Sequence, residues 1–169
     1  MILFKIIKNS YTDTWADYQK TKSFTEGARW NEKGTPAMYL SSNIQNAMLE
    51  AANYSPSPKI VNKLFSVCVF EFPELRLKAV EPDELPRSWN ATSHTLETKE
   101  FGSNYLLGAT YQGIILPSVT MNSDVALHPI NAVRQSVYAN VVINPESVEL
   151  ERVRMLSKHA PVYSERMFL

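Results

Sequence analysis

The sequence predicts an α+β fold of about six or seven short strands with two or three helices. Segments rich in β-branched and aromatic residues outnumber the helical ones, and the two kinds do not alternate regularly as in a doubly wound α/β sheet. The chain has 169 residues, 44% of them hydrophobic and 20% charged, so it can enclose one sizeable core. Its proline-rich pieces are short loops, and we therefore expect a single domain over 1–169.

Two strands with irregular backbone between them are predicted before residue 41. Residues 3–7 combine β-branched and aromatic side chains, and 37–40 form a short apolar run, so both favour strands. Between them, 11–19 is polar with spaced aromatic residues and indicates a short helix or a loop. The glycines and the proline of 23–36 indicate irregular backbone.

A helix is predicted directly after the second strand. Ser42 followed three residues later by Gln45 forms a capping-box pattern, which is typical of a helix start. Apolar residues at helical spacing then make one stripe, consisting of Ile44, Ala47, Met48, Ala51 and Ala52. Glu50 falls at the margin of this stripe, where an acid is either solvated or directed into a cleft beside the core.

The second half of the chain supplies the remaining strands and one further helix. Segments that predict strands lie at 63–72, 75–80, 113–118, 139–145 and 147–155. The first of these is apolar on both faces over much of its length, which predicts a position inside the sheet. Residues 93–108 are expected to be helical with a break near Gly102, whereas 119–138 show no clear periodicity.

The composition excludes several classes of function. Basic and acidic residues number 17 each, so the strong basic excess of a general nucleic-acid binder is missing. The single cysteine, Cys68, rules out an internal disulfide and a cysteine zinc cluster, and the three histidines show no metal-ligand spacing. No apolar run approaches the roughly 18 residues of a membrane-spanning helix. We therefore expect a soluble cytoplasmic protein without a metal site, direct nucleic-acid binding or membrane attachment.

Four side chains are candidates for a functional site, and each has a structural alternative. Arg29, in a glycine-flanked turn, suits a phosphate group that it can bind through two hydrogen bonds, but it can equally pair with a carboxylate such as Glu50. Tyr39 ends a short strand, where a phenol either packs or stacks on a flat ring. Ser118 follows a buried strand, although loops are rich in serine. The local residues leave these alternatives open.

The order of several segments resembles the signature of the RES-domain family. The matching segments are GARWNEKGTPAMYLSS with AMLEA, LPRSWN, FGSNYLLG, LPSVT and ANVVINP. They occur in the family's order and extend from about residue 3 to 150, which makes the resemblance far more specific than any one segment. The arginine, glutamate and serine that name the family fall on Arg29, Glu50 and Ser118.

This resemblance implies a toxin of a bacterial toxin–antitoxin pair that degrades NAD+. The family's fold is an ADP-ribosyltransferase-like split β-sheet with flanking helices. Its partner is an Xre-type antitoxin that occludes the NAD+ pocket. The toxin can also form a homo-oligomer within the complex. Several members act by phosphorolysis, which implies an NAD+ phosphorylase or glycohydrolase that uses NAD+ and inorganic phosphate as substrates and needs no cofactor. The alternatives are ADP-ribosyl transfer to a macromolecule and a non-catalytic binding module.

The resemblance also assigns roles to individual residues. Arg29 and Glu50 are the expected catalytic residues, with Arg29 on phosphate and Glu50 on the ribose, where a carboxylate can stabilise an oxocarbenium-like centre. The expected NAD+-binding residues are Arg29, Tyr39, Ser118 and Asn140.

One stretch, 119–139, departs from the family pattern. In the family the serine element is soon followed by the N-x-x-x-N-P strand, whereas here 21 residues separate Ser118 from Asn140. We interpret this stretch as an insertion that serves as a lid, as an antitoxin contact or as an inert loop.

Overall fold

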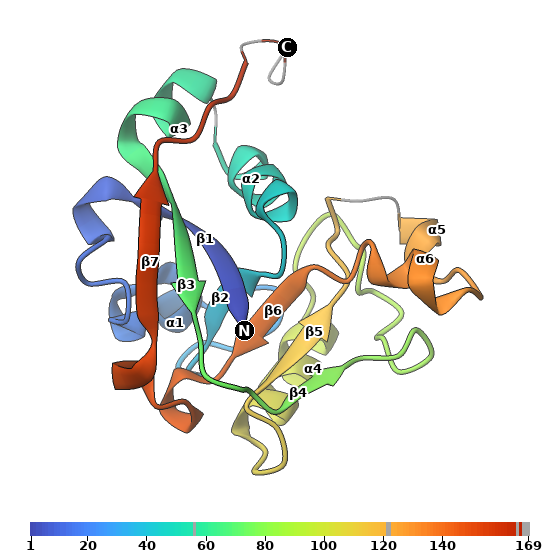
Figure 1. The fold of residues 1–169 in the computed structure, drawn as a ribbon. Helices are drawn as coiled ribbons and strands as arrows, with labels where there is room; N and C mark the ends of the chain where they lie inside the picture. Colours follow the sequence, from blue (N-terminus) through green and yellow to red (C-terminus); the bar gives the residue numbers. More distant parts are fainter. Residues whose placement is uncertain (56, 121–122, 165, 167–169) are drawn as a thin grey trace.

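A seven-stranded mixed sheet forms the centre of the molecule (Figure 1). The computed structural model describes residues 1–55, 57–120, 123–164 and 166. The strand order is β4-β5-β6-β2-β1-β3-β7. The strands are Ile2–Lys8 (β1), Met38–Ser41 (β2), Phe65–Glu71 (β3), Leu77–Ala79 (β4), Gly113–Leu116 (β5), Asn140–Ile143 (β6) and Arg154–His159 (β7). β4 and β5 are parallel and the other pairs antiparallel, which confirms the predicted α+β class.

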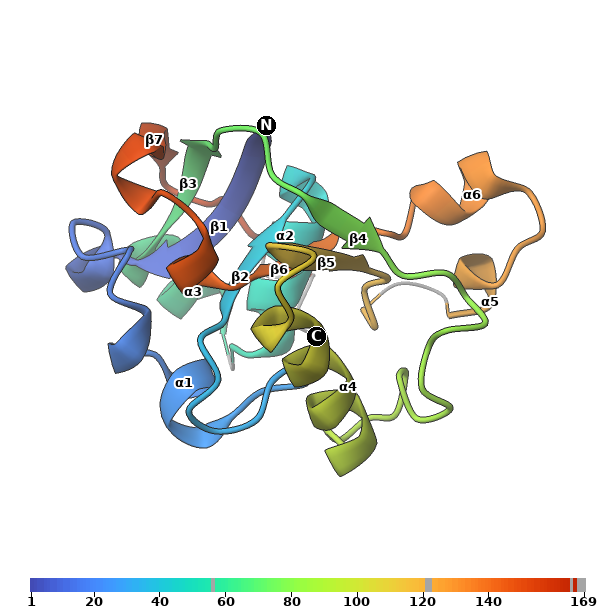
Figure 2. The ribbon, with the colours of Figure 1, turned by 90° about the horizontal axis from the view of Figure 1, so that it is seen from below.

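Helices flank this sheet on one face and at its ends. They are Lys22–Glu26 (α1), Ile44–Asn53 (α2), Pro58–Leu64 (α3), Leu96–Leu107 (α4), Ser123–Ala126 (α5) and Asn131–Gln135 (α6). Figures 1 and 2 show α1 and α4 on the same face of the sheet, and α5 and α6 as a lobe to one side. Within the described residues, no helix has the length and apolar character needed to cross a bilayer.

The sheet is split between β1 and β2. These two strands pair at a single position, Phe4 with Ser41, whereas β1 and β3 pair from Ile2–Glu71 through Lys8–Phe65. The two halves, β4-β5-β6-β2 and β1-β3-β7, therefore separate from one another beyond that contact. This is the split sheet expected from the family resemblance.

The core has one part on each face of the sheet, as alternation along the strands requires. Val141 and Ile143 of β6 join a buried cluster with Leu3 and Phe70, which belong to the other half of the sheet. Val142, between them in sequence, joins a second cluster that includes Trp30 and Leu106 of α4. One continuous strand thus connects both clusters.

Several elements differ from the prediction. The described chain has six α-helices where two or three were expected, because α1, α3, α5 and α6 are 4 to 7 residues long, too short for a periodic apolar stripe. The strand predicted at 147–155 is displaced, since Leu150–Arg152 form a 3₁₀ turn and β7 begins only at Arg154. The predicted position of 63–72 inside the sheet is confirmed, because β1 and β7 flank β3.

The predicted helix break near Gly102 is wrong, and the glycine has a packing reason instead. α4 runs without interruption through Gly102. A Cβ atom at this position would lie 2.1 Å from the backbone oxygen of Trp30, so the helix and the turn of Trp30 touch backbone to backbone. Phe101 packs beside this contact, with its ring centre 6.2 Å from that of Trp30. The glycine therefore lets α4 support the turn that carries Arg29.

We expect Gly102→Ala to destabilise the fold by about 3 kcal/mol, because the new methyl group must displace backbone rather than a mobile side chain. Alanine is ordinarily the better helix former by about 1 kcal/mol, so a loss of stability can only come from this contact. Urea unfolding measures the difference. Gly108→Ala is the matched control, since its nearest neighbour would lie at 3.2 Å, and equal stability loss in the two variants would contradict the prediction.

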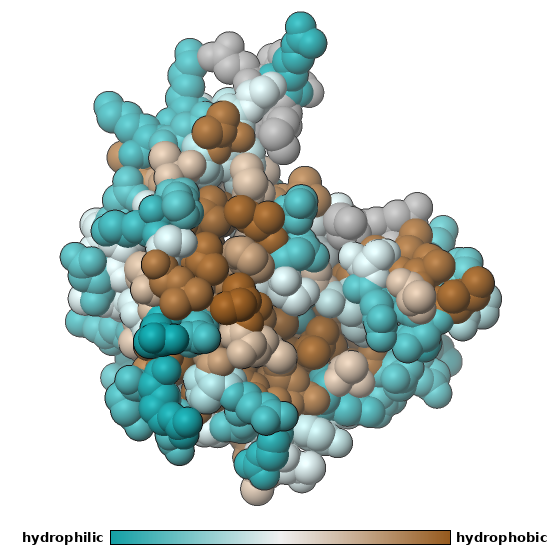
Figure 3. Space-filling view, viewed as in Figure 1, coloured by the Kyte–Doolittle hydropathy of each residue, from teal (hydrophilic) through white to brown (hydrophobic). Residues whose placement is uncertain are grey.

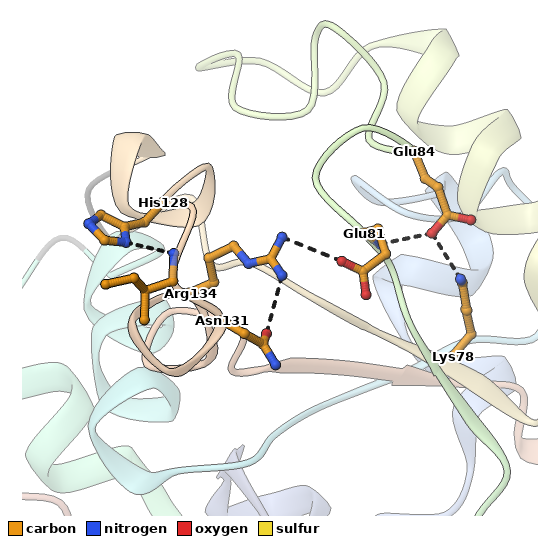
Figure 4. Close-up of polar contacts among 7 residues, drawn as sticks. Lys78, Glu81, Glu84, His128, Asn131 and Arg134 are labelled. Atoms are coloured by element: carbon orange, nitrogen blue, oxygen red, sulfur yellow. Dashed lines mark hydrogen bonds and ion pairs between the residues drawn. The ribbon is translucent and has the colours of Figure 1, made fainter.

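Polar contacts fasten the predicted insertion to the side of the sheet next to β4. Figure 4 shows Arg134 of α6 directed toward Glu81, with 3.4 Å between Nη1 and Oε2. Glu84 in turn accepts a hydrogen bond from the backbone N–H of Glu81 at 2.8 Å and pairs with Lys78 of β4 at 2.9 Å. Residues 121–122 of the predicted insertion lie outside the described residues.

Candidate functional site

A cavity of about 520 Å³ lies where the two halves of the sheet separate. β1 and β2 contribute to its wall, and α2, α3 and the start of β6 complete it. Its ionisable and amide side chains are Arg29, Tyr39, Glu50, Tyr54 and Asn140. A concave site of this volume with a few converging polar groups is typical of a small-molecule pocket.

Arg29 is held on a rigid turn at the wall of this cavity. The turn is closed by a backbone hydrogen bond of 3.0 Å between Ala28 and Asn31, and Gly27 precedes it at a φ of 81°, a conformation that favours glycine. The Arg29 side chain is 8% exposed, and its Nη1 donates to the backbone oxygen of Trp89 at 3.1 Å. Since a guanidinium has five N–H donors, this bond orients the group and leaves others for a ligand.

Tyr39 connects the same turn to β2. Its hydroxyl donates to Asn31 Oδ1 at 2.8 Å and accepts from the backbone N–H of Trp30 at 3.0 Å. Burial raises the pKa of Tyr39 well above its ordinary value, so the phenol stays a neutral donor at physiological pH. The ring lines the cavity, while its stacking on a nicotinamide ring stays a prediction.

Glu50 reaches the cavity because α2 is rotated from its predicted orientation. The helix cap is Asn43, whose side chain accepts from the N–H of Asn46, so the predicted cap at Ser42 is one residue early. Ile44, in the predicted apolar stripe, is 37% exposed, whereas Asn46 on the opposite side of the helix is buried. The inner face of α2 covers the cavity and the polar start of β6 rather than an apolar core, and apolar periodicity therefore misplaces it.

The two remaining candidates meet at Glu50. Ser118 Oγ donates to Glu50 Oε1 at 2.9 Å, and Asn140 Nδ2 donates to the same oxygen at 3.0 Å. Asn140 lines the cavity, whereas Ser118 is 1% exposed and lies behind the carboxylate. Because both bonds end on Oε1, they fix the carboxylate and leave Oε2 out of this network.

The alternative in which Arg29 forms a structural ion pair with Glu50 is wrong. Across the part of the chain that the structure describes, no ion pair joins these two residues. Each is instead held by uncharged partners, Arg29 by a backbone oxygen and Glu50 by a hydroxyl and an amide. Both charges therefore remain available to a ligand in the cavity.

Lys5 borders the cavity through its place on β1, but its side chain belongs to the other face of the sheet. Phe4 pairs with Ser41 and so shares a face with Tyr39, whereas Lys5 pairs with Cys68 on the opposite face. Burial lowers the pKa of Lys5 to about 8, because the charged ammonium loses hydration. The Lys5 ammonium is therefore not a cation of the site.

The charges of the site suit an anionic ligand that develops a positive centre. Arg29 is the cation and Glu50 is the acid, both on one cavity. Cations bind phosphate groups, and a fixed carboxylate stabilises a cation that forms during a reaction. Within the described ranges, no three His, Cys, Asp or Glu side chains are grouped as metal ligands.

Comparison with known proteins shows the same family over almost the whole chain. The model of the RES domain matches residues 2–160. Toxin Res of Yersinia enterocolitica is 26% identical over 144 residues, which cover 83% of this chain and 92% of that protein. Toxin Res of Photorhabdus laumondii is 27% identical over 133 residues, covering 77% and 83%.

A solved structure shares the fold. The crystal structure of the M. tuberculosis MbcT–MbcA toxin–antitoxin complex contains a chain that superposes with a TM-score of 0.65 at 12% sequence identity. The match covers 99% of this chain and 86% of that one. With the family model matched from residue 2 to residue 160, this chain belongs to the RES domain family.

Proposed function

We propose that this protein is a toxin that cleaves the bond between nicotinamide and ribose in NAD+. Inorganic phosphate is the proposed acceptor, so that the products are nicotinamide and ADP-ribose 1''-phosphate. The observation that carries the proposal is a single cavity in which Arg29 accompanies a carboxylate, Glu50, that two neutral donors hold in place.

Glu50 fits the step in which the glycosidic bond breaks. Loss of nicotinamide leaves positive charge on the ribose ring, as in glycoside cleavage. A carboxylate that is already oriented stabilises this charge without reorganising during the reaction. The bonds from Ser118 and Asn140 supply that orientation, and Oε2 is free of both bonds to approach the ribose.

Arg29 fits a phosphate group of the reaction. The guanidinium can bind two oxygens of the NAD+ pyrophosphate at once, because its donors form a planar fork. Trp89 keeps Arg29 oriented through its backbone oxygen.

The names of the relatives support a toxin with a protein partner. Two relatives are named Toxin Res, and the structural neighbour comes from a toxin–antitoxin complex. We infer an antitoxin, of Xre type, that covers the cavity in a cytoplasmic complex. The lobe of α5 and α6 fits the antitoxin-contact alternative for the insertion, because Leu127 and Ile130 are more than half exposed and apolar side chains gather at its outer end (Figure 3).

The purified protein incubated with NAD+, with and without phosphate, tests the proposal. Nicotinamide release that requires phosphate, with ADP-ribose 1''-phosphate as the second product, is expected. Release without phosphate would identify a glycohydrolase instead. Labelled NAD+ that marks a protein or nucleic acid would identify the transferase alternative, and no release under any condition would leave the binding-module alternative.

A further inference from the structure

Asn46 is a buried polar residue one helical turn before Glu50. Its side chain is 2% exposed and points away from solvent into the contact between α2 and β6. Residues four apart on a helix lie on the same face, so Asn46 and Glu50 both face the start of β6. Asn46 does not line the cavity and cannot touch a ligand there.

A chain of hydrogen bonds connects Asn46 to Glu50. Asn46 Nδ2 donates to Asn140 Oδ1 at 2.8 Å, and Asn140 Nδ2 donates onward to Glu50 Oε1 at 3.0 Å. Asn46 Nδ2 also donates to Ser41 Oγ at 2.8 Å, and Ser41 Oγ donates to the backbone oxygen of Ala139 at 3.0 Å. Every member of this chain comes from α2, β2 or the beginning of β6.

The direction of this chain is set at its backbone end. A backbone oxygen can only accept, so Ser41 gives its hydroxyl proton to Ala139 and its oxygen is left as an acceptor. Asn46 must then direct its NH₂ group, not its carbonyl, toward Ser41. The same NH₂ group reaches Asn140, which is left with its carbonyl toward Asn46 and its own NH₂ group toward Glu50.

A second observation is that this arrangement leaves one buried polar atom without a hydrogen bond. The Oδ1 atom of Asn46 is buried and has no hydrogen-bond partner among the described residues. If the side-chain amide of Asn46 were flipped, its carbonyl oxygen would face the oxygens of Ser41 and Asn140. Neither of these two acceptors would then receive a hydrogen bond from Asn46. The two donated bonds therefore determine the orientation, although the carbonyl oxygen is left without a partner.

We propose that Asn46 is a positioning residue that orients the Asn140 amide and thereby the Glu50 carboxylate. This inference rests on the proposed role of Glu50 in NAD+ cleavage. An ionised carboxylate only accepts hydrogen bonds, so it needs the NH₂ group of Asn140 and not the carbonyl. Without Asn46, only Glu50 still distinguishes the two ends of the Asn140 amide, so the amide is held less firmly against the carboxylate.

The test replaces Asn46 by leucine, whose side chain has the same branched shape and number of heavy atoms but no polar group to donate to Ser41 or Asn140. We expect kcat for nicotinamide release to fall on the order of tenfold, with the KM for NAD+ changed less than about twofold, because the substrate does not contact Asn46. Asn43→Ala is the matched control, since it removes the cap of the same helix, which accepts from the backbone N–H of Asn46, and keeps every side-chain hydrogen bond between Asn46 and Glu50. That variant should lose stability and keep its kcat.

A double-mutant cycle shows whether Asn46 acts through Asn140. In an Asn140→Ala background, Asn46→Leu should cause no further fall in kcat, because the group that it orients is missing. If the two substitutions lower kcat independently, so that the double variant shows the product of the two single effects, the proposal is overturned. An equal loss of kcat in Asn43→Ala and Asn46→Leu would also overturn it, because helix stability would then account for the effect.

A readout that needs no turnover separates this inference from the proposed function. The side-chain amide of Asn140, followed by ¹⁵N NMR and assigned by its loss in Asn140→Ala, should shift and exchange faster with water in Asn46→Leu. If the wild type releases no nicotinamide but this signal moves, the proposed function fails and the orienting role stands. If nicotinamide is released and neither kcat nor the signal changes in Asn46→Leu, the orienting role fails.

Discussion

Glu50→Gln is expected to lower the rate of nicotinamide release by about 100- to 1,000-fold, the usual effect of removing one electrostatic stabiliser of a transition state. The side-chain oxygen of glutamine can still accept from Ser118 and Asn140, which donate at 2.9 and 3.0 Å. The substitution therefore removes the charge while the carbonyl keeps its place. A loss of rate must then come from the missing charge at the ribose.

Nicotinamide formation by wild type and variant, separated by chromatography, measures this effect. Thermal unfolding of both proteins shows that the fold is kept. Glu26→Gln is the matched control, because Glu26 is an exposed acid at the end of α1 that does not line the cavity. Full activity in Glu50→Gln would rule out the carboxylate as the group that stabilises the ribose. Toxicity in cells should disappear together with the enzymatic activity.

Arg29→Lys is expected to lower kcat/KM for NAD+ on the order of 100-fold, or by about 3 kcal/mol, through a higher KM. Lysine keeps the charge but loses the planar fork that binds two phosphate oxygens together. It also cannot reproduce the 3.1 Å bond to the backbone oxygen of Trp89 along with a bond to the ligand. The remaining ammonium should therefore bind the pyrophosphate weakly and without a defined orientation.

Steady-state kinetics and a direct binding measurement with ADP-ribose separate the two parts of this effect. Weaker binding of ADP-ribose should accompany the rise in KM, because that ligand contains the pyrophosphate. Arg87→Lys is the control, an exposed arginine two residues before Trp89 on the same loop. An unchanged KM in Arg29→Lys would contradict the assignment of the pyrophosphate to Arg29.

The candidate site was predictable where the chemistry lies in short, ordered segments. The turn of Arg29, the strand of Tyr39 and the helix of Glu50 follow one another within 27–51, so local patterns place them correctly. The family resemblance placed Ser118 and Asn140 in the same site as Glu50, but it did not predict that both bind the Glu50 carboxylate. The contacts themselves span 68 and 90 residues of sequence, and no local pattern predicts them.

The parts that could not be predicted depend on which surface each element meets. The apolar stripe of α2 includes Ile44, which the structure exposes, whereas it buries the polar Asn46. Periodicity assumes that a helix turns its apolar side to the core, and this helix covers a cleft instead.

The sequence by itself determined the α+β class, the position of most strands and the membership of Arg29, Glu50, Ser118 and Asn140 in one ordered pattern. These follow from residue types and their spacing along the chain. Only the tertiary structure decided that β1 separates from β2, that Arg29 binds a backbone oxygen rather than Glu50, and that Asn46 orients Asn140. The physical reason is that every residue carries a backbone oxygen and an amide has two similar ends. Packing between distant segments decides which of these groups meets a given side chain. No local sequence pattern records that packing.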